Sequence, residues 1–167
     1  RKAAAVTDLG AVWMGRKAFY NYSGGGVQKV PCDVSDYVFS DINQSQQTKI
    51  CATTNARFSE VWWFYPSGAS TENDRYVSWN YAENTWAIGE LSRTAAVDHG
   101  TFRQPLWADG NNYHIYEHEL GFDYGSATPF AESGPIMLSA GDQVMSVVDL
   151  IPDEKTQGDV QAKFKTR

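Results

Sequence analysis

The stretch KICATTNARFSEVWWFYPSGASTENDRYVSWNYAENTWAIGE, residues Lys49–Glu90, decides the fold class of this chain. Four short runs in it are rich in aromatic and β-branched residues, which favour strands, and polar linkers separate them: Lys49–Thr54, Glu60–Tyr65, Arg75–Tyr81 and Thr85–Glu90. In the third run, polar and apolar residues alternate with the period of two that a strand requires. We predict one four-stranded antiparallel sheet, whose last two strands form a hairpin about Ala82–Asn84.

Further strands and one helix are predicted before this stretch. Apolar and aromatic runs at Val6–Met14, Lys17–Ser23 and Val27–Cys32 are separated by glycine-containing turns. The segment Asp33–Asn43 is predicted to be the only helix of more than two turns, with Asp33 as its N-cap. Its apolar residues recur at helical spacing: Val34, Tyr37, Val38 and Ile42.

Looser strand-like runs follow the central stretch. They are Pro105–Ala108, Tyr113–Leu120, Ile136–Leu138, Val144–Ile151 and finally Val160–Arg167. At about 40–45 residues for each group of four strands, the chain has the length of three to four propeller blades. The chain opens on Arg1, and its last run still has strand composition, so we expect both ends to be cut from a longer chain.

Composition supports an all-β fold. The 167 residues are 42% hydrophobic, 20% charged and 14% aromatic, which excludes a disordered chain and favours strands over helices. We predict consecutive antiparallel β-propeller-like blades with one short helix. Residues 1–48 form hairpin strands, the helix and a partial blade, 49–91 a four-stranded blade, and 92–167 further blade strands.

The charge balance disfavours tight nucleic-acid binding. Fourteen basic residues against 20 acidic ones give a net charge of −6, and no basic run is present to displace counterions from phosphate. No apolar run is long enough to cross a membrane as a helix. The two cysteines, Cys32 and Cys51, are too few for a disulfide scaffold; we expect reduced thiols, with a bridge or a reactive thiol as the alternatives.

No catalytic, cofactor-binding or metal-binding residue is predicted, and no cofactor. His114 and His118 share a face of a predicted strand about 13 Å apart, too far for one metal ion. The carboxylates that a glycosidase could use are Glu60, Glu90, Asp98, Glu117 and Glu119, but exposed carboxylates are common in any acidic chain. The pair Trp62-Trp63 points to opposite faces of its strand, for packing between blades, a subunit contact or a sugar-stacking platform.

Four segments resemble a family of tailed-phage virion proteins, in the same order along the chain: Trp13–Tyr20, Pro31–Asn43, Phe58–Asp98 and Ala131–Arg167. The class is the tail hub or nozzle of short-tailed phages, also described as packaged-DNA stabilisation proteins. The resemblance implies a non-enzymatic, β-propeller-containing protein of the virion, in a symmetric ring around the DNA exit channel.

The partners that the resemblance implies are other copies of the chain, a portal-side adaptor, tail proteins and, transiently, packaged DNA, with no membrane. Acidic residues of Asp33–Asp41, Glu72–Asp74 or Asp153–Glu154 are then expected to contribute to a channel surface that does not hold DNA. The alternative is a carbohydrate-binding or glycosidase-type propeller of a phage tailspike.

Overall fold

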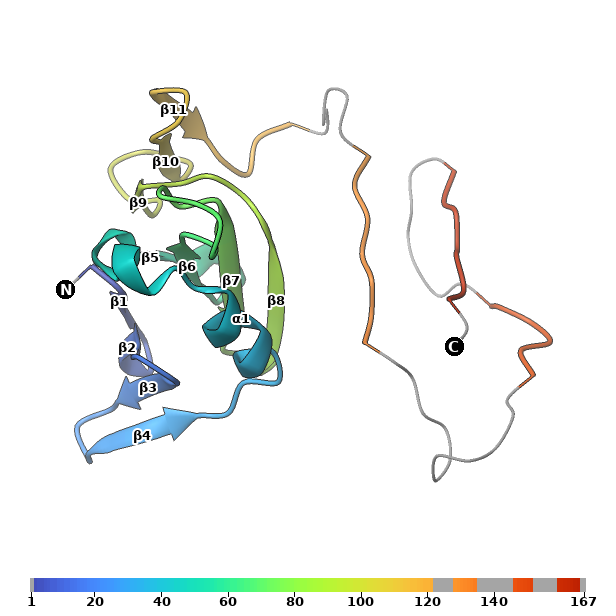
Figure 1. The fold of residues 1–167 in the computed structure, drawn as a ribbon, viewed down its shortest axis with the longest axis horizontal. Helices are drawn as coiled ribbons and strands as arrows, with labels where there is room; N and C mark the ends of the chain where they lie inside the picture. Colours follow the sequence, from blue (N-terminus) through green and yellow to red (C-terminus); the bar gives the residue numbers. More distant parts are fainter. Residues whose placement is uncertain (1, 122–127, 135–145, 152–158, 166–167) are drawn as a thin grey trace. The chain divides into compact units, whose positions relative to one another are not determined.

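A computed structural model describes residues 2–121, 128–134, 146–151 and 159–165 (Figure 1). The chain divides into two units, Arg1–Asp123 and Tyr124–Arg167. All the described helices and strands belong to the first unit. It is all-β apart from one short α-helix and two 3₁₀ helices, and it contains three antiparallel sheets.

The central sheet confirms the predicted four-stranded antiparallel sheet. Its strands are β5 (Cys51–Asn55), β6 (Glu60–Tyr65), β7 (Arg75–Asn80) and β8 (Thr85–Glu90), paired antiparallel in chain order. The short 3₁₀ helix η2 (Ala56–Phe58) links β5 to β6. Asn80 fixes the predicted hairpin between β7 and β8, because its Oδ1 accepts hydrogen bonds from the amides of Ala82 and Glu83 at 3.0 and 2.9 Å.

The N-terminal sheet contains four strands where the sequence predicted three. They are β1 (Ala4–Thr7), β2 (Gly10–Met14), β3 (Phe19–Tyr22) and β4 (Val27–Val30), again paired in chain order. The run Val6–Met14 is therefore not one strand. Gly10 has a φ of 111°, and a Cβ at this position would collide with the carbonyl oxygen of Tyr22, so the chain turns there.

The helix is in the predicted place, but it is shorter and is not capped as predicted. Helix α1 (Ser35–Asp41) has only about two turns, and Val34, not Asp33, is its N-cap, without a side-chain hydrogen bond. The chain leaves the helix at Ile42 because Asn43 starts the 3₁₀ helix η1 (Gln44–Lys49), accepting a hydrogen bond from the Ser45 amide at 3.0 Å. Tyr37, predicted on the apolar face, is 51% exposed.

The third sheet contains β9 (Ala95–Val97), β10 (Leu106–Asp109) and β11 (His114–Glu117), with β10 in the middle. The sequence predicted β10 and β11, although β11 ends three residues earlier than expected. It missed β9, whose three residues are too few to show alternation.

The strands predicted in the second unit are not borne out where that unit is described. Ser146–Ile151 and Val160–Lys165 carry no strand, and the residues 136–138, 144–145 and 166–167 lie outside the described residues. A strand is stable only when its backbone pairs with a neighbour, and the alternation of apolar residues does not supply one. Val148, for example, is 94% exposed.

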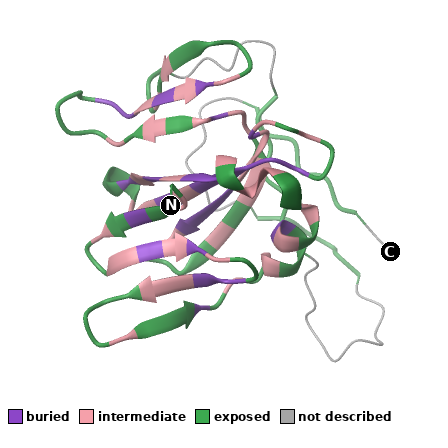
Figure 2. Cartoon of the chain, turned by 60° about the vertical axis from the view of Figure 1, so that its left-hand side comes forward, coloured by how far each residue is buried: buried purple, intermediate pink, exposed green. Residues whose placement is uncertain are grey.

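The three sheets are stacked, with the central sheet between the other two (Figure 1). Successive side chains of strand β6 point to opposite faces and contact different sheets. Val61, Trp63 and Tyr65 belong to a core shared with the N-terminal sheet and α1. Trp62 and Phe64, on the opposite face, pack with Trp107 of the third sheet. Burial is accordingly greatest in the central sheet (Figure 2), and the three sheets of the first unit form a stack.

Candidate functional site

The first strands of the three sheets lie side by side, with β5 between β1 and β9. A backbone hydrogen bond of 2.8 Å from the Ala52 amide to the Lys2 carbonyl joins β5 to the segment just before β1. The residues that follow β5, β9 and β11 meet near the end of β5. Three of the five candidate carboxylates lie at this junction.

Two of the candidate carboxylates converge at the junction on one buried amide. Asn55, the last residue of β5, is fully buried, and its Nδ2 donates to Glu60 Oε2 at 3.3 Å and to Glu119 Oε1 at 3.1 Å. The indole Nε1 of Trp62 also donates to Glu60 Oε2, at 2.8 Å. Glycoside hydrolysis uses a pair of carboxyl groups, and Glu60 and Glu119 are the two that share a hydrogen-bond donor here.

Asp98 lies next to this pair and holds the ends of β5 and β9 together. Its Oδ2 accepts hydrogen bonds from Thr54 Oγ1 at 2.6 Å and from the Ala56 amide at 2.9 Å. Burial alone would raise the pKa of Asp98, but these hydrogen bonds and two from His99 lower it below its ordinary value. Asp98 is therefore a carboxylate at neutral pH, suited to accepting hydrogen bonds and not to donating a proton.

The remaining two candidate carboxylates lie elsewhere. Glu90, at the end of β8, forms an ion pair with Arg75. Glu117, at the end of β11, is paired across from Leu106 and is exposed. Of the five candidates, the structure thus brings two onto one amide and places Asp98 beside them.

A cationic and aromatic cluster lies on the third sheet, and the sequence analysis missed it. The Arg93 side chain is 7% exposed; its Nε donates to His118 Nε2 at 3.0 Å and its guanidinium lies 4.4 Å from the ring centre of Tyr116. His118 in turn lies against Trp107, with ring centres 3.9 Å apart. Burial, together with the Arg93 charge, lowers the pKa of His118 to about 4, so it is neutral and accepts from Arg93.

The two histidines of the predicted strand are in different environments. His114 is exposed at the start of β11, whereas His118 follows the strand and is engaged by Arg93. Among the described residues, no group of three or more histidine, cysteine, aspartate or glutamate side chains is placed to hold a metal ion.

The tryptophan pair on β6 does point to opposite faces, as predicted, and each face meets another sheet. Trp63 is fully buried against the N-terminal sheet, where its Nε1 donates to the Ala3 carbonyl at 3.0 Å. Trp62 is partly buried, with its ring centre 5.2 Å from that of Trp107. Packing between sheets therefore accounts for both rings.

Asn73 holds the central and third sheets together from the β6–β7 loop. It is fully buried, and its Nδ2 donates to the carbonyls of Lys49 and Arg93 at 3.0 and 2.9 Å. Nothing in the sequence distinguishes Asn73 from the other asparagines, because its partners are backbone atoms far away in the chain.

Both cysteines are free in the structure. Burial raises the pKa of Cys32 and of Cys51 to about 11. Neither is a thiolate at neutral pH, which argues against a reactive thiol.

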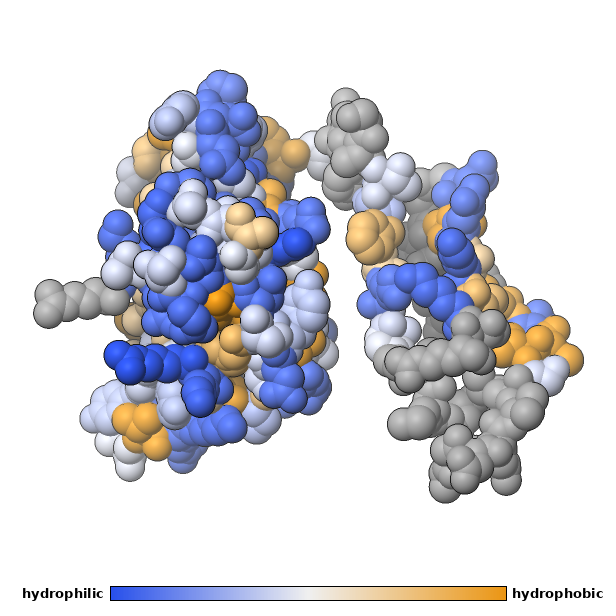
Figure 3. Space-filling model, in the orientation of Figure 1, coloured by the Kyte–Doolittle hydropathy of each residue, from blue (hydrophilic) through white to orange (hydrophobic). Residues whose placement is uncertain are grey.

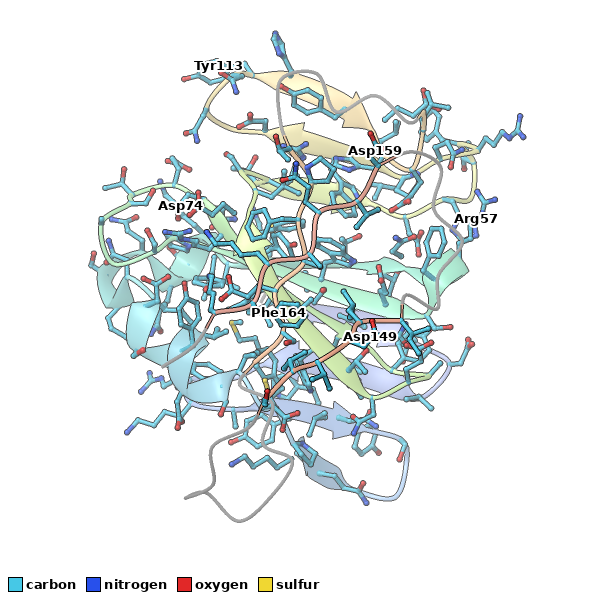
Figure 4. The ribbon with its side chains drawn as sticks, turned by 90° about the vertical axis from the view of Figure 1, so that its right-hand side faces the viewer. Arg57, Asp74, Tyr113, Asp149, Asp159 and Phe164 are labelled. Atoms are coloured by element: carbon cyan, nitrogen blue, oxygen red, sulfur yellow. The ribbon has the colours of Figure 1, made fainter. Side chains whose placement is uncertain are left out.

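Some of the acidic side chains proposed for a channel surface are already engaged in interactions within the chain. Glu72 pairs with Lys49, and Asp74 accepts from the amide and hydroxyl of Ser67 at 2.7 Å each in the β6–β7 loop (Figure 4). Asp33 and Asp36 are exposed, and Asp36 lines an open hollow together with Arg16 and Lys17. Residues 153–154 lie outside the described residues.

No helix among the described residues is long and apolar enough to span a membrane. Comparison with models of known protein families and with curated proteins finds no match to this chain.

Proposed function

We propose that this chain is a non-enzymatic structural component of a phage virion, in the tail hub or nozzle, where it forms part of a symmetric ring around the DNA exit channel. One observation carries the proposal: three antiparallel sheets are stacked face to face with their first strands side by side. Blades of a β-propeller are arranged in this way around a central axis. The resemblance of the four segments to hub and nozzle proteins supports the same conclusion.

The site chemistry is consistent with a structural role. The most deeply buried polar side chains, Asn55 and Asn73, hold the central sheet to the third sheet. The net charge of −6 suits a conduit, because each basic contact with phosphate adds affinity and slows the passage of DNA.

The test is electron cryomicroscopy of purified virions of the phage that encodes this chain. We expect density for the three stacked sheets in a ring around the channel, next to the portal-side adaptor. A particle that lacks the chain, or carries it only at the tip of a tailspike, contradicts the proposal.

A second candidate function, polysaccharide hydrolysis by a tailspike, is favoured by the convergence of Glu60 and Glu119 on one amide beside Trp62. The measurement is release of reducing sugar from polysaccharide of the host surface. Hydrolysis that Glu60→Gln and Glu119→Gln abolish, and that the matched control Glu90→Gln does not, would establish this function. The hub proposal expects no hydrolysis by any of these proteins.

A further inference from the structure

The three sheets carry the same cross-strand pair. In each, an alanine of the first strand lies opposite a tryptophan of the second: Ala4 and Trp13, Ala52 and Trp63, and Ala96 and Trp107. The tryptophans are 50 and 44 residues apart. We call the face of a sheet that carries this pair its rear face, and the opposite face its front face.

Two of the three rear faces are covered by the front face of the preceding sheet. Trp63 is 0% exposed, with its ring centre 4.9 Å from that of Phe19 on the N-terminal sheet. Trp107 is 1% exposed, with its ring centre 5.3 Å from that of Phe64 on the central sheet. The rear face of a sheet is therefore a surface that receives the front face of another sheet.

The remaining rear face, on the N-terminal sheet, is covered by no other sheet of the first unit. The strand pairing arranges its residues in two rows: Ala4, Trp13, Tyr20 and Lys29, and Val6, Ala11, Tyr22 and Val27. Three of these residues have large apolar or aromatic side chains that are exposed to solvent: Val6 at 78%, Val27 at 61% and Tyr22 at 47%. The rings of Trp13 and Tyr20 stack on each other with centres 5.7 Å apart. The hydrophobic patch over β4 is seen at the lower left of Figure 3.

The other end of the stack presents an open front face. On the third sheet this face also contains two rows: Ala95, Ala108 and Ile115, and Val97, Leu106 and Glu117. Val97 is 60% exposed and Ile115 73%. On the other two sheets, the front face is a buried core surface, represented by Val12 and Phe64 at 0% exposure.

We propose that these two open faces bind each other between copies of the chain: the rear face of β1–β4 of one copy packs on the front face of β9–β11 of the next. The contact pairs the same two types of face that meet at both junctions inside the chain. The only Lys, Arg, Asp or Glu side chains in the four rows have opposite charge, because Lys29 lies on the rear face and Glu117 on the front face.

Such a contact is heterologous, since it joins two different patches. Repetition generates a closed ring where the rotation between copies closes, and an open filament where it does not. The inference rests on the proposed function, because a ring of copies requires contacts between them. It adds which two surfaces of each copy form those contacts.

Two variants block one face each. Val6→Asp places a charge on the rear face of the N-terminal sheet, and Ile115→Asp places one on the front face of the third sheet. Both positions are exposed in the single chain, so both variants should fold. Tyr113→Asp is the matched control, because Tyr113 is 90% exposed at the tip of the β10–β11 hairpin, outside the four rows (Figure 4).

Sedimentation velocity of the purified proteins over a concentration series is the measurement, with circular dichroism to verify folding. We expect the unchanged chain and Tyr113→Asp to form species larger than a monomer as concentration rises. Each blocked variant alone should be a monomer. A one-to-one mixture of the two blocked variants should give a dimer and nothing larger, because it retains one open rear face and one open front face.

Three outcomes would overturn the proposal. The first is an unchanged chain that stays monomeric at about 100 μM, because a specific contact of standard size should have a dissociation constant below that concentration. The others are blocked variants that still assemble and a mixture that remains monomeric. The location of the chain in the virion does not enter this test. A monomeric chain found in the tail overturns the contact alone, and an assembling chain absent from the virion overturns the proposed function alone.

Discussion

Replacing Trp63 by alanine tests the statement that the N-terminal and central sheets share one core. The Trp63 side chain is 0% exposed, and its ring centre lies 4.9 Å from that of Phe19 and 6.1 Å from that of Trp86. Truncating a fully buried tryptophan to alanine loses its transfer free energy and leaves a cavity, which together cost about 3–5 kcal/mol of unfolding free energy. The loss is a large fraction of the stability of a domain of this size, about 5–15 kcal/mol.

The hydrogen bond of Trp63 contributes a smaller, separable part. Its Nε1 donates to the Ala3 carbonyl at 3.0 Å, but the Met14 amide donates to the same oxygen at 3.0 Å. The carbonyl therefore keeps one partner when the indole is removed. Losing this bond should cost only the net value of a hydrogen bond, about 0.5–1.5 kcal/mol, and not the larger penalty for an orphaned buried group.

The loss of unfolding free energy is measured by urea denaturation, monitored by circular dichroism at a concentration where the chain is monomeric. We expect Trp63→Ala to lower the unfolding free energy by about 3–5 kcal/mol, and Trp63→Phe by less. Trp13→Ala is the matched control, because Trp13 holds the equivalent place on the uncovered sheet; since Trp13 is only partly buried, it should cost less than Trp63→Ala. Equal losses for Trp63→Ala and Trp13→Ala would refute the assignment of covered and uncovered faces.

Three further predictions concern the helix cap, a histidine and DNA. Asp33→Ala should change the unfolding free energy by less than about 0.5 kcal/mol, because Asp33 does not cap α1. Asn43→Ala removes the cap of η1 and should cost about 1 kcal/mol. A loss for Asp33→Ala larger than that for Asn43→Ala in urea denaturation would contradict the cap assignment. His118 has a folded pKa of about 4, below the unfolded value of about 6.5, so its contribution to stability is complete above pH 6.5 and is lost as the pH falls towards 4. His118→Gln should flatten this part of the stability profile, and an NMR titration that gives His118 a pKa near 6.5 would contradict the Arg93 contact. Duplex DNA should bind no better than about millimolar at physiological salt; submicromolar binding in a fluorescence anisotropy titration, with a steep salt dependence, would favour a protein that clamps DNA.

The central sheet could be predicted from the sequence because its information is local. The alternation within Arg75–Asn80 specifies the faces, and the short polar linker before Thr85 specifies the hairpin. The N-terminal sheet was harder, since the turn between β1 and β2 depends on Gly10 and on hydrogen bonds of the Thr7 hydroxyl, inside a run that otherwise has the composition of one strand. Strand β9 is three residues long and carries no periodic signal.

The candidate site could be predicted only in part, for a different physical reason. Glu60 and Glu119 were recognised as carboxylates, but their proximity depends on Asn55, 64 residues before Glu119. The Arg93 cluster likewise depends on an acceptor 25 residues away. Interactions of this kind join strands of different sheets, and no local pattern records which residues will face each other.

The Ala–Trp repeat lies between these two cases. Each tryptophan is locally conspicuous, but its role depends on whether another sheet covers the face on which it lies. Trp63 and Trp107 have such a sheet and are core residues; Trp13 has the same cross-strand partner, yet it is only partly buried. An aromatic side chain of this size gains free energy from burial against any complementary sheet, whether from the same chain or from another copy. The residues that pack one sheet on another within the chain are therefore of the same kind as those on the two open faces. Burial of apolar surface between sheets would drive both the folding of one copy and its association with the next.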